Sequence, residues 1–297
     1  MDKENVLEPV VFRYRSRELS LPDIHEIQAV VSQFYAKGRA YISRELCQAW
    51  GWVQPNGKLK EYAARDLLLR LEEKGFFALP PRLRPANNRP KAFVQIPLFA
   101  QAPLEGALHQ HGEPTLQLVA SQERYLWDYL VHQYHYLGHP RLVGEHIRYL
   151  VFLKGQVIAC LGWASAAFKV QPRDRFIGWD IPTRRKNLCF VANNVRFLIL
   201  PWVRIPHLAS KVLALSLTRL SRDWQTLYAH PLYLAETFVD TSRFAGTCYQ
   251  ASNWIHVGET QGSSKRGNRY FDHGQPKAIY LYPLHRNFRR KLCDDAG

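Results

Sequence analysis

The stretch that decides the fold is residues 194–224, which read NVRFLILPWVRIPHLASKVLALSLTRLSRDW. Its first part, residues 194–203, is nearly all apolar and predicts a strand that is buried on both faces. A strand with one face exposed to solvent would alternate apolar and polar residues. Residues 208–224 predict an amphipathic helix. A buried strand that leads into such a helix is typical of α/β proteins. The apolar stripe of the helix consists of Leu213, Leu217, Leu220 and Trp224.

The same patterns extend in both directions. Upstream, two apolar runs joined by the turn Lys154-Gly155 predict a hairpin, and a strand and a helix precede it. Downstream, strands alternate with one short helix. Residues 116–285 are therefore expected to form a single domain of α+β or α/β class. Strands are predicted at 116–120, 147–153, 156–163, 232–239, 255–260 and 278–284, and helices at 121–138 and 247–254.

Residues 20–82 predict a separate domain. Apolar residues recur at helical spacing in segments 20–37, 44–50 and 58–74, and residues 76–79 predict a short strand. Three helices, a strand and a basic tip are typical of a winged helix, which lays its third helix in the major groove of DNA. The alternative is a helical protein-interaction domain with a solvated basic face.

Three segments flank or connect these domains. Residues 1–19 are expected to form an N-terminal arm, and residues 286–297 a basic tail. Residues 83–115 are expected to be a linker, because seven prolines fall from Pro80 to Pro114. A short strand is predicted inside the linker at 93–96.

The charge of the chain narrows the class of partner. It has 40 Lys and Arg residues against 25 Asp and Glu, a formal net charge of +15. Such an excess points to DNA or another nucleic acid first, and to an anionic membrane surface second. A spanning helix needs roughly 20 apolar residues, and the longest apolar stretch, about 195–203, is too short. The five cysteines are scattered, and no signal peptide is predicted, which favours the cytoplasm.

Basic residues gather in groups that suit contacts with a phosphate backbone. One group belongs to the third predicted helix and the arm that follows it. A second surrounds a tryptophan in a segment predicted to be a loop, a combination that suits single-stranded or flipped-out DNA. A third lies in a Gly/Ser-rich loop. In this order, the candidate DNA-binding residues are Lys58, Lys60, Arg65, Arg82, Arg84 and Arg89; Arg173, Arg175, Trp179, Arg184, Arg185 and Lys186; and Lys265, Arg266 and Arg269, with the C-terminal Arg286, Arg289, Arg290 and Lys291 in addition.

The predicted order of helix, hairpin, strand, helix, strand, helix and strand resembles the GNAT acyltransferase fold. In that fold two central strands of a mixed sheet splay apart and hold an acyl-coenzyme A. Residues 240–258 resemble its C-terminal segment, in which a tyrosine at the position of Tyr249 serves as a general acid. The resemblance implies acyl-coenzyme A as cofactor, with Arg204, His207 and Ala209 in the cofactor loop. Here His207 replaces a glycine and Pro206 removes an N–H donor, and both departures count against the cofactor.

A resemblance over nearly the whole chain rests on five motifs. They are QYHYLG at 133–138, IGW at 177–179, NNVRFLILP at 193–201, HLAS at 207–210 and ETFVD at 236–240. Together they resemble the DruA family of the Druantia anti-phage system, whose relatives also occur with transposable elements. Residues 240–258 also resemble Mom-type phage proteins, which modify adenine in DNA on a GNAT-like scaffold.

Four residues are candidates for catalysis. Asp240 ends a predicted strand, where a carboxylate can act as a base or simply cap the following turn. Tyr249 and Asn253 lie four apart, which places them on one face of a helix, and the alternative is helix packing. His135 is a candidate general base, or a ring that closes its helix onto the sheet. No metal site is predicted, because no carboxylate accompanies the histidines at 132, 135 and 139.

The sequence therefore predicts a cytoplasmic DNA-binding protein of a defence system or mobile element. Whether the second domain is an enzyme stays open. One alternative is a base-modifying, acyltransferase-like enzyme, and another is a strand-cleaving protein related to transposition. Other defence-system or transposon proteins are expected as partners in addition to DNA.

Overall fold

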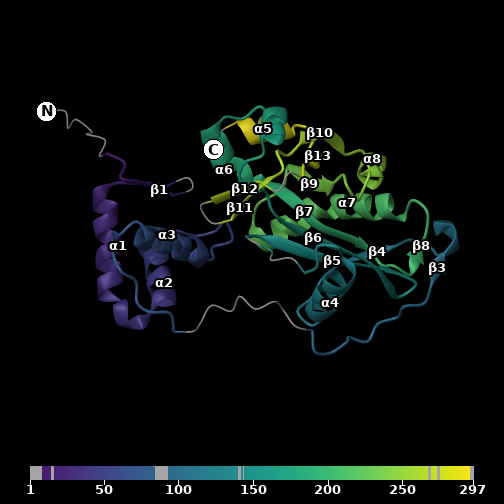
Figure 1. The fold of residues 1–297 in the computed structure, drawn as a ribbon, viewed down its shortest axis with the longest axis horizontal. Helices are drawn as coiled ribbons and strands as arrows, with labels where there is room; N and C mark the ends of the chain where they lie inside the picture. Colours follow the sequence, from purple (N-terminus) through teal and green to yellow (C-terminus); the bar gives the residue numbers. More distant parts are fainter. Residues whose placement is uncertain are drawn as a thin grey trace. The chain divides into compact units, whose positions relative to one another are not determined.

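The computed structural model describes residues 9–14, 17–83, 93–139, 142, 144–266, 269–272 and 275–294, with the backbone alone for 263–266 and 269–272. The chain divides into two compact units, Met1–Pro90 and Lys91–Gly297 (Figure 1). Each unit has a hydrophobic core of its own. Among the described residues no helix is long and apolar enough to cross a membrane.

The first unit consists of a short hairpin followed in the chain by a bundle of three helices. The hairpin pairs β1 (Phe12–Tyr14) with β2 (Arg17–Leu19), and the helices are α1 (Leu21–Gln33), α2 (Arg39–Ala49) and α3 (Glu61–Glu73). Ser20 and Asp23 form a capping box at the start of α1, which satisfies two of the N–H groups that a helix leaves unpaired. The buried stripes of the three helices form one core, which includes Ile27, Ile42, Leu46, Leu67 and Leu71.

The three helices confirm the sequence prediction, but the predicted strand at 76–79 is wrong. This segment has no regular structure, because its backbone is anchored by side chains instead of by a neighbouring strand. Gln28 donates to the carbonyl of Phe76 at 2.7 Å, and the N–H of Leu79 donates to Glu72 at 2.8 Å. The hairpin of this unit precedes α1, whereas a winged helix places its wing after the third helix.

The second unit contains a seven-stranded mixed sheet in the order β10-β13-β9-β7-β6-β5-β4. All neighbours are antiparallel except β7 and β9, which are parallel. The strands are β4 (Thr115–Leu118), β5 (His146–Leu153), β6 (Gln156–Ser165), β7 (Val191–Ile199), β9 (Leu234–Asp240), β10 (Ile255–Glu259) and β13 (Lys277–Pro283). Each of these strands overlaps a predicted one.

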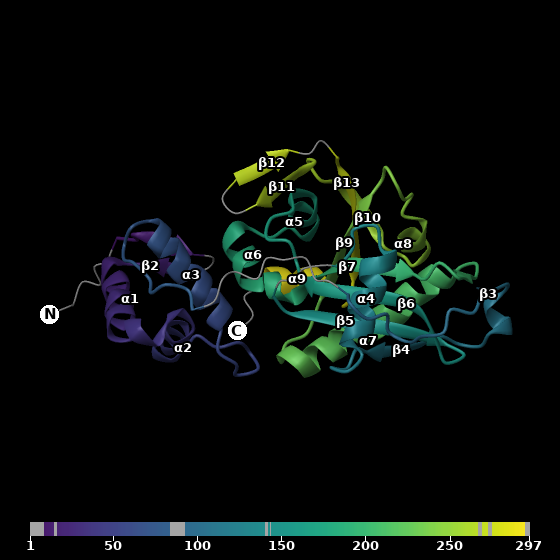
Figure 2. The same cartoon turned by 60° about the horizontal axis from the view of Figure 1, so that its bottom comes forward.

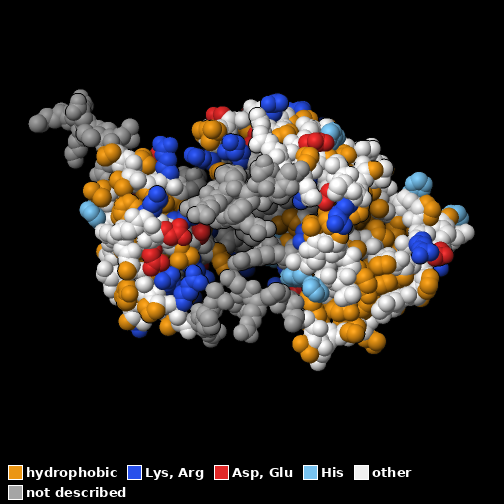
Figure 3. All heavy atoms as spheres, in the orientation of Figure 1, with side chains coloured by type: hydrophobic (Ala, Val, Ile, Leu, Met, Phe, Trp, Pro, Cys, Tyr) orange, Lys and Arg blue, Asp and Glu red, His pale blue; other side chains and the backbone are white. Residues whose placement is uncertain are grey.

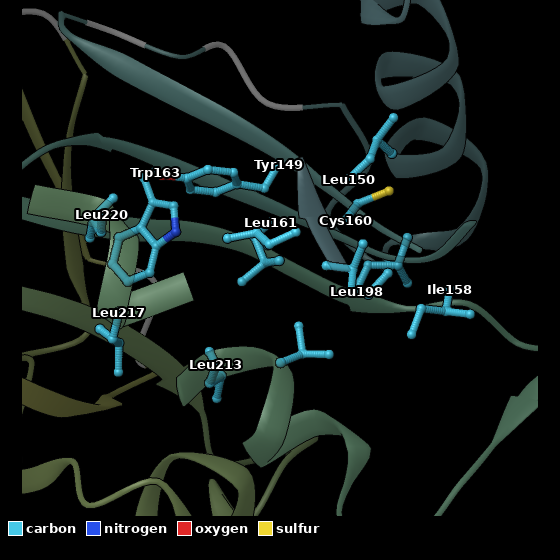
Figure 4. Close-up of a cluster of buried hydrophobic side chains, with 14 of the residues drawn as sticks. Tyr149, Leu150, Ile158, Cys160, Leu161, Trp163, Leu198, Leu213, Leu217 and Leu220 are labelled. Carbon is cyan, nitrogen blue, oxygen red and sulfur yellow. The ribbon is translucent and has the colours of Figure 1, made fainter. Parts of the chain in front are cut away.

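Two long helices cover opposite faces of this sheet. The indole N–H of Trp127, in α4 (Arg124–Tyr134), donates to the carbonyl of Leu161 from one face. On the other face Leu213, Leu217 and Leu220 of α7 (Leu208–Tyr228) lie opposite Leu161 and Trp163 (Figure 4). The buried stripe of α7 is the one that its helical spacing predicts.

Three short helices pack together at one end of the sheet (Figure 2). They are α5 (Gln171–Ile177), α6 (Ile181–Asn187) and α9 (Phe288–Cys293), which share a small core with Val191, Leu234 and Leu281. The predictions of a loop at α5 and α6 and of a tail at α9 are therefore wrong. Pro172 and Pro182 lie in the first turns of α5 and α6, where a proline costs no hydrogen bond.

The segment predicted to be a linker belongs in part to the second unit. Residues 93–96 form no strand, but the ring of Phe93 packs on Tyr125 and Tyr129 of α4. Further along, β3 (Leu104–Glu105) pairs in parallel with β8 (Val203–Arg204). A last hairpin joins β11 (Ser263–Arg266) to β12 (Arg269–Asp272) where the sequence predicts a loop.

Candidate nucleic-acid interface

The two parallel strands of the sheet separate after four residue pairs. β7 and β9 are paired from Val191 and Leu234 to Asn194 and Thr237. The strands separate beyond the pair Asn194–Thr237, and we call this point the fork. From there β7 continues beside β6, and β9 continues beside β13. The opening between the strands is the place where the GNAT resemblance implies a cofactor.

Tyr249, in α8 (Thr247–Ala251), closes the fork. Its hydroxyl donates to Oδ1 of Asn194 at 3.1 Å and lies 3.5 Å from Oγ1 of Thr237. Rings of Phe197, Trp254 and Tyr280 surround it. Burial raises the pKa of the Tyr249 hydroxyl, so this group stays protonated and braces the two strands. A role as general acid stays a prediction.

Asn253 does not share a helical face with Tyr249, and that prediction is wrong. The helix ends at Ala251, and Asn253 adopts the left-handed conformation with φ of 63°. Its side chain is exposed and lines a cavity, whereas the Tyr249 side chain is buried at the fork. The two groups therefore have no common surface on which to act together.

Asp240, at the end of β9, caps the turn that follows. Its Oδ1 accepts hydrogen bonds from Oγ of Ser242 at 2.6 Å and from the Ser242 N–H at 3.2 Å. These bonds hold the pKa of the Asp240 carboxyl below its usual value, with a further contribution from Arg243. The geometry matches the turn-capping alternative, and catalysis by Asp240 stays a prediction.

His135 lies in the same neighbourhood as Asp240. Its ring stacks on Tyr136 at 4.9 Å, and the Arg243 guanidinium lies 5.2 Å from the Tyr136 ring and 3.7 Å from Oδ2 of Asp240. Burial, with the charge of Arg196, lowers the pKa of His135 to about 4. His135 and Asp240 are thus linked only through Tyr136 and Arg243, and catalysis by His135 stays a prediction.

Two histidines of this helix end, His132 and His139, both pack on the ring of Phe93. His139 also lies 2.9 Å from Oδ1 of the buried Asp128, so the expectation that no carboxylate accompanies these histidines is wrong. Within the part of the chain that the structure describes, no three His, Cys, Asp or Glu side chains could hold a metal ion.

The predicted cofactor loop forms one wall of an open cavity of about 830 Å³. His207 lines it and adopts φ of 61°, the left-handed conformation that a glycine would take without strain. Lys211 also lines the cavity, where it pairs with Glu113 at 2.9 Å. Arg204 points into solvent, 3.6 Å from Glu105, and Ala209 is not among the lining residues.

An acyl-coenzyme A does not fit the residues present. The cavity is walled by residues 106–109, the start of α7, the end of α8 and Tyr282. None of the described residues of β7 lines it, and the fork itself is filled by Tyr249 and its aromatic neighbours. The described lining of the cavity therefore does not extend to the space between the separating strands.

A strongly basic surface covers the three short helices, and Figure 3 shows its blue side chains over α5 and α6. We call it the basic face. Seven of its cations are exposed and one is half-buried, while its exposed carboxylates among the described residues are Asp180 and Asp294. The cations are Lys169, Arg175, Arg185, Lys186, Arg286, Arg289, Arg290 and the half-buried Lys291.

Three members of the predicted group around Trp179 are buried, which corrects the prediction of an exposed cluster. Arg173 is 0 % exposed and donates to Glu236 of β9 and to Asp174, at 2.8 Å each. Arg184 donates to the same Asp174 at 2.8 Å, and Trp179 is 8 % exposed. Carboxylates hold both guanidinium groups in the interior, so Arg173 fixes α5 on the sheet and is closed off from solvent.

In the first unit the candidate cations differ in their partners. Arg65 lies 3.8 Å from Glu61 and over the ring of Tyr62. Lys58 is exposed and Lys60 half-buried, and neither forms an ion pair with a described residue. Arg82 is exposed. Arg84 and Arg89, and the side chains of Lys265, Arg266 and Arg269, lie outside the described part of the structure.

Several solved structures are similar in fold to part of this chain. An aminoglycoside acetyltransferase AAC(6')-Ib in complex with coenzyme A shares 13% identity over 60% of this chain and 98% of that chain, with a TM-score of 0.38. A GNAT-family acetyltransferase from Bacillus cereus ATCC 10987 shares 12% over 59% and 100%, with a TM-score of 0.35. The ribosomal-protein-S18-alanine N-acetyltransferase from Escherichia coli shares 9% over 59% and 98%, with a TM-score of 0.36.

The match to a family model identifies the family of the chain, which the low TM-scores of the solved structures do not. No curated protein matches the sequence. Residues 84–269, more than half of the chain, match the family model described as Druantia protein DruA. The matched range contains all five motifs that resemble this family, and the relationship with Mom-type proteins stays a prediction. The chain therefore belongs to the DruA family of Druantia proteins.

Proposed function

We propose that the protein is a DNA-binding component of an anti-phage defence system, and that its basic face holds the phosphate backbone of duplex DNA. Membership of the Druantia family supports the defence role. The observation that supports DNA binding is the basic face, which contains eight cations and, among the described residues, two exposed carboxylates. Other proteins of the same defence system are expected partners.

Two cations of the basic face are held in place by contacts within the protein. The guanidinium of Arg289 lies 4.5 Å from the centre of the Phe176 ring, and its Nε donates to the Phe176 carbonyl at 3.0 Å. The ammonium of Lys291 lies 5.0 Å from the centre of the Tyr233 ring. Fixed side chains lose less conformational entropy on binding, which favours contact with a rigid, regularly spaced polyanion.

The first unit provides a second set of DNA contacts in this proposal. Lys58 and Lys60 precede α3, and Arg82 follows the bundle, so their charges are available for phosphate groups. Because acyl-coenzyme A fits poorly, we favour a protein that binds DNA over an enzyme that transfers an acyl group to DNA. The net charge of +15 fits a protein that holds DNA for other members of its system.

The proposal is tested by DNA affinity as a function of salt concentration. Fluorescence anisotropy with a labelled duplex should give a steep fall of affinity with salt, since each phosphate contact contributes a slope of about 0.9. The double variant Arg185→Ala/Arg290→Ala should reduce that slope by about 2. The matched control is Arg222→Ala, an exposed arginine of α7, which should leave the slope unchanged. Equal slopes for the double variant and the wild type would overturn the proposal.

A further inference from the structure

The basic face contains a shallow, open hollow of about 700 Å³ at the corner between α5 and α6. Trp179 and Arg184 line it from the interior, and Lys169 and Arg175 line it from the exposed side. Asp174, which also lines the hollow, accepts hydrogen bonds from Trp179 Nε1 at 3.0 Å and from Arg184 at 2.8 Å. These bonds fix the orientation of the indole and the guanidinium.

Arg184 has a donor that the protein leaves unused. The residue is 7 % exposed, and its Nη1 is committed to Asp174, but its buried Nε has no hydrogen-bond partner among the described residues. A buried donor of a charged group is costly to leave unpaired and is normally satisfied by protein, water or a ligand. Arg184 also lines the hollow, so a ligand there would lie against its guanidinium group.

The walls of the hollow are partly apolar, which distinguishes it from a site for phosphate alone. Ile181 lines it and is 56 % exposed, and Pro182 lies beside it. Phe168 is not itself a lining residue, but it precedes Lys169, is 53 % exposed, and its ring centre lies 5.2 Å from the Arg184 guanidinium. Apolar and aromatic side chains at such a position suit the flat face of a nucleobase.

We infer that this hollow takes an unstacked nucleotide of the bound DNA, an inference that rests on the proposed function. The base packs against Ile181, with Phe168 beside the hollow, and its edge lies against the guanidinium of Arg184. Lys169 and Arg175 contact the flanking phosphates. The energy needed to unstack the base is least at a bulge, a mismatch or a single strand, so these structures are the preferred ligands.

The test compares a fully paired duplex with the same duplex carrying a single-base bulge. The wild type should bind the bulged duplex about tenfold more tightly, the effect of stacking one base. The double variant Phe168→Ala/Ile181→Ala should lose this preference while its affinity for the paired duplex stays unchanged. Both side chains are more than half exposed, so the variant is expected to fold. The matched control is Ile255→Ala, an apolar residue of β10 that is 41 % exposed, and it should keep the preference.

The outcomes separate this inference from the function on which it rests. Salt-dependent binding without preference for the bulge, or a preference that survives in the double variant, would overturn the inference and leave DNA binding intact. Absence of salt-dependent binding to either duplex would overturn both.

Discussion

The hydroxyl of Tyr249 donates to Oδ1 of Asn194 at 3.1 Å, at the last residue pair that joins β7 to β9. The bond ties α8 to the two strands at the point where they separate. The hydroxyl that the GNAT resemblance implies as a general acid thus braces the two strands, and its role in proton transfer stays a prediction. This relationship leads to the first of four predictions.

Removal of the Tyr249 hydroxyl should destabilise the second unit. Tyr249→Phe leaves the buried Oδ1 of Asn194 without its donor, and the free energy of unfolding should fall by about 1–2 kcal/mol. Chemical denaturation followed by circular dichroism measures the change. Tyr282→Phe is the control, because the Tyr282 hydroxyl has no hydrogen bond to a described residue, and it should change stability little. Equal stability of Tyr249→Phe and wild type would contradict the brace.

Arg173 and Glu236 form an ion pair in which both side chains are 0 % exposed, with 2.8 Å between Nη1 and Oε2. Arg173→Met leaves the carboxylate of Glu236 buried and uncompensated, which should cost about 3–5 kcal/mol of unfolding free energy. Arg173→Met/Glu236→Leu should recover part of that loss, because it removes the unpaired charge.

The control for this pair is exposed. Arg204 is 77 % exposed and lies 3.6 Å from Glu105, so Arg204→Met should cost under about 1 kcal/mol. Thermal denaturation of the four proteins gives the comparison. A loss for Arg173→Met as small as that for Arg204→Met would argue against a buried pair.

In the first unit the lysines ahead of α3 should matter more for DNA binding than Arg65. Glu61 already offsets the charge of Arg65 at 3.8 Å, whereas Lys58 and Lys60 form no ion pair with a described residue. Lys58→Ala/Lys60→Ala should reduce the salt slope of duplex binding by about 2, and Arg65→Ala by less than one. If Arg65→Ala reduced the salt slope more than Lys58→Ala/Lys60→Ala, the DNA contacts would instead lie on the exposed face of α3.

His135 should make the second unit less stable in acid. Its pKa is about 4 in the folded protein because of burial and Arg196, against an ordinary value of 6.5. Between these values the unfolded chain binds the proton and the folded protein does not. The stability that His135 contributes is thus complete above pH 6.5 and decreases as the pH falls towards 4.

The variant for this prediction is His135→Asn, whose amide oxygen can replace Nδ1 as acceptor for the N–H of Leu137, at 3.1 Å in the wild type. The difference in unfolding free energy between pH 7 and pH 4 should be smaller for this variant than for the wild type. The control His109→Asn changes an exposed histidine and should match the wild type. An unchanged pH dependence in His135→Asn would show that other groups carry the acid sensitivity.

The sheet and its two long helices were predictable because apolar periodicity is local. The stripe of α7 and the apolar runs of β5, β6 and β7 identify their own faces without knowledge of the rest of the chain. The short helices are not predicted because six or seven residues carry little periodicity. A signal was present, since Pro172 and Pro182 occupy positions that favour the first turn of a helix.

The candidate site was only partly predictable, because its electrostatics are non-local. The run of cations around Trp179 predicts Arg173 at the surface, while its partner Glu236 lies 63 residues away on β9. A carboxylate in the middle of the apolar stretch LAETFVD was the available signal, since a buried charge requires a partner. The basic face depends equally on α9 returning to α6, which no local pattern indicates.

The attachment of residues 93–110 to the second unit has a practical consequence for work on fragments. The ring of Phe99 stacks on Trp202 at 5.7 Å, and the side chain of Gln156 donates to the carbonyl of Ala102 at 2.8 Å. A fragment begun at residue 116, where the folded domain starts by periodicity, would uncover Trp202, unpair β8 and remove a wall of the 830 Å³ cavity. A fragment begun at residue 91 keeps these contacts, and is the one expected to be soluble on its own.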